Sequence, residues 1–258
     1  MKNIAIDIHS HINHGARFDS KPVDYGKIYC AEKEFLLEEY KRTNILCGGF
    51  STFDSVLSNR NVYAENEYMS NLAQIEKNVF FWAVLSPLDK NSYSQVEKLL
   101  KNPKCLGIKI HSVYHQYDIL RYGGEIFDFA NQMKAWVLMH NDKILSMPNF
   151  ANENPRMKLI IAHLGSSEHI EAIKTARYGN IYTDTSGIAS SNNNIIEYAV
   201  KEVGAEKIFF GTDTYSCGFQ KGRIEYADIK DIDKEKILYT NAKQSFINFS
   251  DIGGNLCR

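Results

Sequence analysis

Cysteines are few in this chain, and their placement excludes two uses of the residue. There are five among 258 residues, at Cys30, Cys47, Cys105, Cys217 and Cys257. The number is odd and no two of them form a CxxC pair, which argues against both a disulfide framework and a structural zinc knuckle. We therefore expect a protein of the reducing cytoplasm. Cys217, in a loop flanked by glycine, is a candidate nucleophile that no local signature supports.

Long apolar runs and an excess of charge of either sign are also absent. No stretch approaches the roughly 18 uncharged apolar residues of a membrane helix. Asp7 and His9 soon interrupt the apolar start of the chain, so we expect neither a targeting peptide nor a membrane partner. The formal net charge is −1, which gives no reason to expect a nucleic-acid partner. The composition, 44% hydrophobic and 24% charged, is typical of a soluble globular protein.

The sequence does contain a regular alternation of short apolar runs with amphipathic stretches. The predicted strands are 4–8, 45–50, 79–85, 106–110, 136–140, 159–162, 181–183 and 208–210. The predicted helices are 32–41, 67–77, 94–101, 125–134, 168–177, 195–203 and 234–246. Continuous apolar strands favour a parallel sheet covered on both faces. Eight strand–helix units in 258 residues fit a (β/α)₈ TIM barrel.

No low-complexity tract, repeat or linker interrupts this pattern, so we expect one barrel domain over residues 1–258, regular or distorted. A doubly wound open sheet is the alternative architecture. The first predicted strand is not followed by a GxGxxG turn, which leaves the dinucleotide-binding version of that fold unsupported.

Polar residues gather where predicted strands end. They are His9 and His11 after the first strand, His111, His140 and His163 at the fourth, fifth and sixth, and Asp213 after the eighth. The period of a strand points His9 and His11 to the same side. The C-terminal ends of barrel strands meet at one mouth, where the active sites of this fold lie. Imidazoles and a carboxylate there suit Zn²⁺, with Mn²⁺, Fe²⁺, Co²⁺ and Ni²⁺ as competitors.

This interpretation depends on the shared position of these residues. A single buried histidine is more often a hydrogen-bonded part of the structure than a ligand. His14, His115 and His169 lie outside the pattern, and we interpret them as loop or helix-surface residues.

Several short motifs along the chain carry a family resemblance. They are IDIHSH (6–11), GIKIH (107–111), MH (139–140), AHLG (162–165), YTDTSG (182–187), FGTD (210–213) and NA (241–242). As an ordered set they resemble the amidohydrolase superfamily. More closely, they look like its amidohydrolase-2 branch of metal-dependent hydrolases similar to aminocarboxymuconate-semialdehyde decarboxylase. The resemblance implies a (β/α)₈ barrel with a catalytic metal in its mouth.

The same resemblance implies roles for the residues at the strand ends. His9, His11, His140 and Asp213 would be metal ligands. His163 would bind a second metal in a binuclear site, or polarise the substrate and orient the attacking water in a mononuclear one. Asp213 would also act as the general acid–base, and His163 would stabilise an oxyanion.

Lys109 bears on the number of metal ions. It lies two residues before His111 on the fourth strand, so both side chains face the same side. Binuclear relatives carry a bridging carboxylated lysine or a glutamate at this strand, and two ions remain an alternative. We favour one ion, with Zn²⁺ as the first choice. Lys109 is then a buried cation that needs a partner, and Asp7 or Asp213 can supply one.

Residues near the predicted mouth are candidates for substrate contacts. They are Arg17, Lys109, His111, Ser186 and Tyr215. Arg17, with Arg223 after the eighth strand, is a candidate to hold a substrate carboxylate in a bidentate pair, and a solvated loop arginine is the alternative for each. Asp184 at the end of the seventh strand is expected to orient a ligand or cap the next turn.

The main functional prediction is a metal-dependent hydrolase. A water activated by the ion would attack a small amide, ester or lactone. The alternative is a metal-dependent lyase, a decarboxylase or hydratase acting on an unsaturated carboxylic acid. A third and weaker hypothesis is a barrel that binds without catalysis. A small molecule is the expected partner, and the resemblance is compatible with a homodimer.

Overall fold

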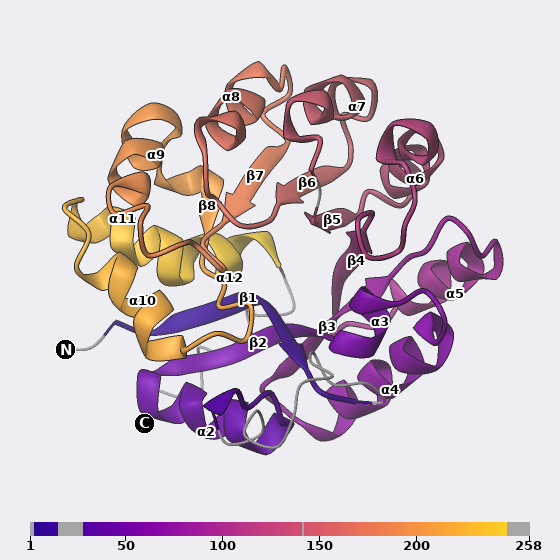
Figure 1. The fold of residues 1–258 in the computed structure, drawn as a ribbon, viewed down its shortest axis with the longest axis horizontal. Coiled ribbons are helices and arrows are strands. Elements are labelled where there is room, and N and C mark those ends of the chain that lie inside the picture. The colour runs from indigo at the N-terminus through magenta and orange to yellow at the C-terminus, as the bar shows by residue number, and fades with distance from the viewer. Residues whose placement is uncertain (1–2, 15–27, 141, 247–258) are drawn as a thin grey trace.

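Eight parallel strands form a barrel that helices surround (Figure 1). The computed structural model describes residues 3–14, 28–140 and 142–246. The strands are β1 (Ala5–Ile12), β2 (Ile45–Thr52), β3 (Val79–Val84), β4 (Cys105–His111), β5 (Trp136–His140), β6 (Lys158–Ile161), β7 (Ile181–Asp184) and β8 (Ile208–Phe209). Each strand pairs in parallel with the next one along the chain. The predicted (β/α)₈ barrel is confirmed.

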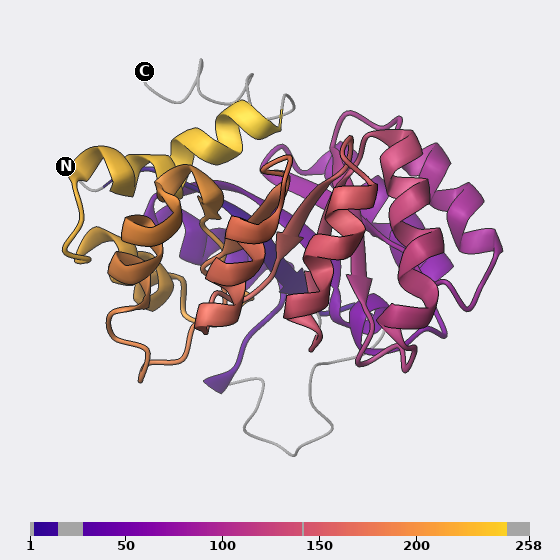
Figure 2. The same cartoon turned by 90° about the horizontal axis from the view of Figure 1, so that it is seen from above.

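Helices between the strands form the outer layer. They are α2 (Lys33–Thr43), α3 (Phe53–Leu57), α4 (Val62–Ile75), α5 (Asn91–Leu99), α6 (Ile119–Met133), α7 (Met147–Glu153), α8 (Ser167–Thr175), α9 (Ile195–Val203), α10 (Cys217–Glu225), α11 (Asp231–Glu235) and α12 (Asn241–Ser245). The 3₁₀ helices η1 (Ile144–Ser146) and η2 (Ala205–Lys207) and the π-helix η3 (Lys236–Thr240) complete the set. Figure 2 shows the helices from the middle of the chain standing side by side outside the strands. None of the helices in the described ranges is long and apolar enough to cross a membrane.

The apolar residues form two layers of core, one inside the barrel and one between the strands and the helices. The inner layer includes Ile8, Trp82, Leu138, Ile160 and Phe209, all nearly inaccessible to solvent. The outer layer is larger and packs the helices onto the opposite faces of the same strands. Strands buried on both faces read as continuous apolar runs, which is why the sequence pattern predicted them.

Strand β1 contains a β-bulge just before the first histidine. Asp7 pairs with Gly48 and Ser10 with Phe50, so three steps along β1 oppose two along β2. Ile8 consequently faces the inner core, and His9 next to it also faces inward, into the mouth. Bulges near active sites redirect side chains in this way. The predicted strand 4–8 stopped short of this bulge, whereas β1 continues to Ile12.

The barrel closes between β1 and the segment that follows the short strand β8. The Ile8 amide donates to the Phe210 carbonyl at 3.0 Å. The amides of Thr212 and Asp213 both donate to the His9 carbonyl, at 3.1 and 2.8 Å. The closure therefore places Asp213 directly beside His9.

A glycine in β2 lets a helix reach this seam. Tyr40 of α2 lies over β2 and donates from its hydroxyl to Asp7 on β1 at 2.7 Å. A Cβ at Gly48 would overlap the Tyr40 hydroxyl and would lie 2.8 Å from the Phe50 ring. Gly48 is thus required by close packing, because any side chain there would displace Tyr40.

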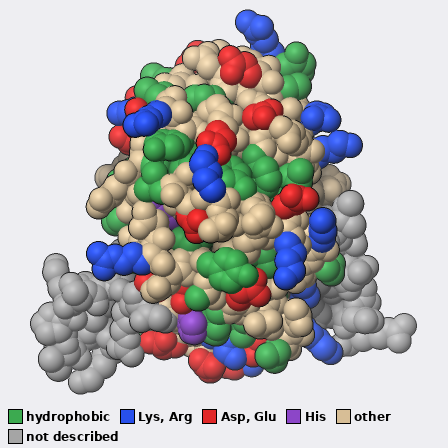
Figure 3. All heavy atoms as spheres, turned by 90° about the vertical axis from the view of Figure 1, so that its right-hand side faces the viewer, with side chains coloured by type: hydrophobic (Ala, Val, Ile, Leu, Met, Phe, Trp, Pro, Cys, Tyr) green, Lys and Arg blue, Asp and Glu red, His purple; other side chains and the backbone are tan. Residues whose placement is uncertain are grey.

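On the side of the barrel that carries α4, α5 and α6, acidic and basic side chains are interspersed (Figure 3). This mixture of signs accords with the near-zero net charge of the chain.

We predict that Gly48→Ala lowers the free energy of unfolding by about 1–3 kcal/mol, because the added methyl group overpacks the contact between Tyr40 and Phe50. Gly124→Ala is the matched control. Gly124 lies in α6 with nothing near its would-be Cβ, and alanine there favours the helix by up to about 1 kcal/mol. Urea denaturation of both variants checks the prediction. Equal stability of the two would contradict it.

Candidate active site

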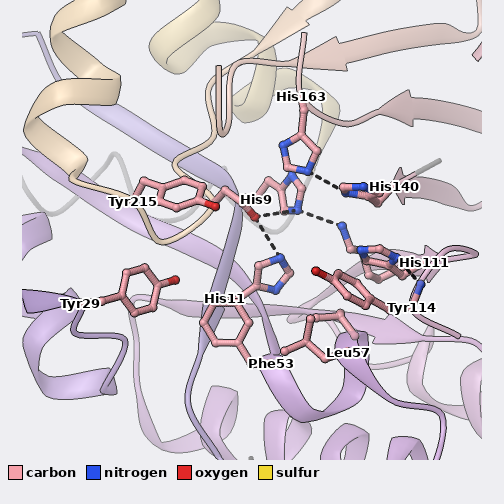
Figure 4. A pocket seen from close by; sticks show the side chains of 13 residues that line it. His9, His11, Tyr29, Phe53, Leu57, His111, Tyr114, His140, His163 and Tyr215 are labelled. Carbon is pink, nitrogen blue, oxygen red and sulfur yellow. Dashed lines mark hydrogen bonds and ion pairs between the residues drawn. The ribbon is translucent and has the colours of Figure 1, made fainter. Parts of the chain in front are cut away.

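The C-terminal ends of the strands surround a cavity of about 110 Å³. Its polar lining consists of His9, His11, Lys109, His111, His140, His163 and Asp213. Its apolar lining consists of Tyr29, Phe53, Val56, Leu57, Tyr114 and Tyr215. Figure 4 shows the imidazoles gathered around one space, with Tyr29 and Tyr215 to one side and the rings of Phe53 and Tyr114 beside His11 and His111. The structure thus brings together every histidine that the sequence placed at a strand end.

Three of these residues converge on one point. His11 Nε2 lies 3.2 Å from Asp213 Oδ1, and His9 Nε2 lies 3.7 Å from the same oxygen. Donor atoms held about 2.1 Å from one ion are about 3.0–3.5 Å apart. His9, His11 and Asp213 therefore have nearly the spacing that a single divalent ion requires.

The far side of each imidazole is fixed by a hydrogen bond. His9 Nδ1 lies 2.9 Å from Asp184 Oδ2, and His11 Nδ1 lies 2.9 Å from Ser51 Oγ. Asp184 takes the orienting position expected from the sequence. Carboxylates and hydroxyls behind metal-binding histidines fix the orientation of the ring and direct Nε2 toward the ion.

The charge states of these groups suit a cation. Burial lowers the pKa of His9 to about 3, with Lys109 adding to the effect, and burial also lowers the pKa of His11. Burial alone would raise the pKa of Asp213. The hydrogen bond from His11 and the surrounding histidines outweigh this and hold that pKa below its usual range. Neutral imidazoles and an ionised carboxylate are the forms that bind metals.

Strained backbone marks the same site. His163, Asp213 and Thr214 have φ values of 65°, 53° and 66°, a left-handed region that costs energy for residues with a side chain. Such strain persists where the surrounding structure over-determines it, and it clusters at functional sites.

The remaining histidines form a chain beside the three converging residues. His140 Nδ1 lies 3.0 Å from His163 Nε2, and the ring of His111 stacks on that of His140 with centroids 4.1 Å apart. His140 lines the cavity but is not one of the converging donors among the described residues. His163, His9 and Asp184 form a second group of close donor atoms. His9 and Asp184 lie close because they are directly hydrogen-bonded, so their proximity does not require a second ion.

Lys109 extends into the cavity floor. Its Nζ lies 2.9 Å from His9 Nε2. Burial lowers the pKa of Lys109 to about 8, although the nearby Asp213 and Asp184 act to raise it. Of the two predicted partners, Asp213 is electrostatically coupled to Lys109, whereas Asp7 lies on the outer face of β1 and hydrogen-bonds Tyr40.

The motifs and this geometry agree with a known family. The model of the amidohydrolase-2 family, described as "Amidohydrolase", matches residues 6–246. The chain belongs to the amidohydrolase-2 family. This confirms the resemblance seen in the sequence, and a divalent-metal enzyme is what membership and the donor set support.

Solved structures similar to this amidohydrolase have the same fold. A dihydroxybenzoic acid decarboxylase from a Polaromonas species, with bound manganese and 2-nitroresorcinol, superposes with a TM-score of 0.78 at 16% identity, covering 95% of this chain and 97% of that one. A 5-carboxyvanillate decarboxylase from Novosphingobium aromaticivorans, complexed with manganese, gives 0.75 at 12% identity over 95% and 96%. A probable 2-pyrone-4,6-dicarboxylic acid hydrolase from Acinetobacter baumannii gives 0.69 at 16% identity over 95% and 99%. No curated protein matches the chain by sequence.

Some, but not all, of the residues predicted to contact the substrate line the cavity. Lys109, His111 and Tyr215 line the cavity of this amidohydrolase. Ser186 does not, because it is fully buried and its hydroxyl lies against His9 Nδ1 at 2.9 Å. Arg17 lies outside the described residues. Its suggested companion Arg223 donates to the backbone carbonyls of Ala189 and Asn192, away from the cavity.

The sequence interpretation identified Tyr215 but missed the part of the apolar wall before α2 and on α3 and one orienting group. Tyr29 precedes α2, while Phe53 and Leu57 lie in α3, a five-residue helix without enough length for a periodic signal. Ser51 holds His11 from the end of β2. The one available signal was position, since β2 also ends at the mouth, but apolar residues and serines are common in any strand.

His115 and His169 were expected in a loop or on a helix surface; His115 does lie in the turn after β4, but both side chains are buried. His115 is buried and its Nε2 lies 2.8 Å from the Ser55 carbonyl. His169 is buried in α8, with Nε2 3.1 Å from the Ala162 carbonyl. Each satisfies a backbone carbonyl within the packed structure. Burial raises the pKa of the Cys217 thiol to about 12, which opposes its use as a nucleophile.

We predict that Zn²⁺ or Mn²⁺ stabilises the folded protein through His11, His9 and Asp213. At a free ion concentration of about 100 times Kd, the gain is about 2.7 kcal/mol. His11→Ala removes one converging donor and abolishes the gain, whereas His14→Gln, which changes a histidine outside the cavity lining, retains it. Thermal unfolding with and without the ion measures the effect. Equal stabilisation of the two variants would contradict the assignment.

Proposed function

We propose that this amidohydrolase is a metal-dependent hydrolase that cleaves a small ester, lactone or amide carrying a negative charge. The observation that carries the proposal is the convergence of His9, His11 and Asp213 at the floor of a small cavity. The cavity volume of about 110 Å³ limits the bound part of the substrate to a compact group.

One zinc ion is the proposed cofactor. Two nitrogen donors and one carboxylate oxygen are a ligand set that zinc takes in catalytic sites, which keep an open position for substrate. His140, which lines the same cavity, is the proposed further ligand. The manganese in two similar structures makes Mn²⁺ the main competitor.

The bound ion would supply Lewis acidity that activates water and polarises the scissile carbonyl. The chain then has to manage the protons. Asp213 is an ionised carboxylate at the cavity floor, 18% exposed in its side chain. We assign its second oxygen the task of accepting a proton from the attacking water and returning it to the leaving group.

Lys109 and His163 would stabilise the negative charge that develops on the substrate. Lys109 is the buried cation of the cavity lining. His163 is held from behind by the Ser186 carbonyl, 3.0 Å from its Nδ1. Preorganised donors of this kind are worth more in a site from which water is excluded.

The second candidate is a lyase that decarboxylates or hydrates an unsaturated carboxylic acid. The observation that favours it is the presence of decarboxylases among the similar structures. The same Asp213 could then return a proton to carbon instead of to a heteroatom leaving group. Lys109 would hold the substrate carboxylate in either reaction.

A panel of substrates distinguishes the two reactions. The protein loaded with Zn²⁺ or Mn²⁺ is assayed against lactones, amides and esters of small acids and against aromatic and unsaturated carboxylic acids. We expect hydrolysis, measured as acid release, with no carbon dioxide formed. Turnover confined to carbon dioxide release or hydration would replace the hydrolase proposal with the lyase.

We predict that Asp213→Asn lowers kcat by about 100-fold or more, because the amide cannot take up a proton.

We also predict that Lys109→Met lowers kcat/KM by about 100-fold for anionic substrates, because the variant lacks the cation. Metal content measured for each variant separates lost chemistry from lost metal. Full activity of Asp213→Asn at normal metal content would exclude the proton-transfer role.

A further inference from the structure

A buried carboxylate on β1 points away from the cavity. Asp7 is fully buried on the outer side of β1, two residues before His9. It does not line the cavity, and the proposed reaction does not use it.

Four hydrogen bonds converge on the Asp7 carboxylate. Oδ1 accepts from the His9 amide at 3.0 Å and from the Thr212 amide at 3.2 Å. Oδ2 accepts from the Tyr40 hydroxyl at 2.7 Å and from the Thr212 hydroxyl at 2.5 Å. All four partners are donors, so both oxygens are fully used as acceptors.

Two of these donors belong to the segments that carry the candidate ligands. The His9 amide lies within the bulge of β1, where the ladder with β2 skips a residue. The Thr212 amide immediately precedes Asp213. A bulge leaves a residue without its regular ladder partner, and the Asp7 carboxylate supplies an acceptor for that amide.

Hydroxyl groups extend the link to the second histidine. Thr214 Oγ1 accepts from the His11 amide at 2.7 Å and donates to the His11 carbonyl at 2.6 Å. The Thr214 amide in turn donates to Thr212 Oγ1 at 3.3 Å. Hydrogen bonds therefore link Asp7 to the backbone of His9, to the residue before Asp213 and, through the Thr212 and Thr214 hydroxyls, to the backbone of His11.

We propose that Asp7 is a positioning residue that locks the β1 bulge to the segment after β8 and so sets the spacing of His9, His11 and Asp213. The inference rests on the proposed metal site. Its structural part, the locking of the two segments, is independent of any ion.

Asp7→Asn is the sharpest test because it keeps size and shape. The NH₂ group of asparagine faces either the amides of His9 and Thr212, which cannot accept, or the hydroxyls of Tyr40 and Thr212, which must turn round to accept from it and lose their charged acceptor. Thr212→Val is a second variant, which removes one of the four bonds and leaves the carboxylate in place.

Co²⁺ alone is the probe, because its visible absorption reports coordination geometry. We expect Asp7→Asn to weaken Co²⁺ affinity by about 10–100-fold, as loss of a supporting partner does, and to change the absorption spectrum. Thr212→Val should give a smaller change in the same direction. Asn180→Ala is the control: Asn180 is buried at the start of β7 and donates to the carbonyls of Ala151, Asn154 and Met157, so its loss destabilises the barrel away from the mouth.

Amide hydrogen exchange supplies a readout that needs no metal. We expect about tenfold or faster exchange in Asp7→Asn peptides covering residues 8–11 and 211–214, relative to the rest of the protein. In Asn180→Ala, exchange in these peptides should change no more than exchange in the rest of the protein. The Co²⁺ spectrum of this variant should match that of the unmodified chain. If Asp7→Asn does not fold, Thr212→Val carries the same test.

The outcomes separate the two proposals. Failure of the unmodified chain to bind Co²⁺ removes the metal site, and the exchange data alone then decide on Asp7. Co²⁺ affinity within twofold and an unchanged spectrum in both Asp7→Asn and Thr212→Val would overturn the positioning role. So would a loss of affinity in Asn180→Ala equal to that in Asp7→Asn.

Discussion

The His9 carbonyl accepts hydrogen bonds from two successive amides, those of Thr212 and Asp213, and the rest of the site depends on this contact. Strand β8 contributes only Ile208–Phe209 to the ladder, so the barrel is completed by these bonds and by the one from Ile8 to Phe210. The same bonds bring the carboxylate of Asp213 against the imidazoles of β1. The contact that closes the barrel is therefore the same contact that brings the donor atoms of His9, His11 and Asp213 together.

Burial gives this site its electrostatic character. His9, His11 and Lys109 are removed from water, and burial depresses the pKa of each. Asp184 and Asp213 remain ionised because the histidines beside them offset the cost of desolvation. The result is a set of lone pairs and negative oxygens that a cation can stabilise, next to a lysine that an anion can stabilise.

Much of the fold and part of the site could be predicted from sequence. The apolar runs gave all eight strands, because strands buried on two faces have a simple signature, and the histidines at their ends pointed to the mouth. Local pattern does not contain the bulge before His9, which depends on the pairing of Asp7 with Gly48 across two strands. Nor does it show that Tyr40, Ser51 and Ser186 contact the strand that bears the histidines. These are long-range contacts of common residues. The burial of His115 and His169 was missed for the same reason, since only the packed structure shows their carbonyl partners.

The closure between β1 and the segment after β8 also determines when the site forms during synthesis. His9 and Asp213 stand roughly 200 residues apart in the chain, so the two halves of the donor set emerge from the ribosome at opposite ends of translation. A nascent chain that has made seven strands holds both histidines of β1 without the carboxylate that completes the group. An ion bound at the proposed site would join the two ends of the barrel, and because the donors are assembled only in the folded chain it would stabilise that state by mass action. The proposed metal site would therefore have its full set of donors only once the last strand has docked.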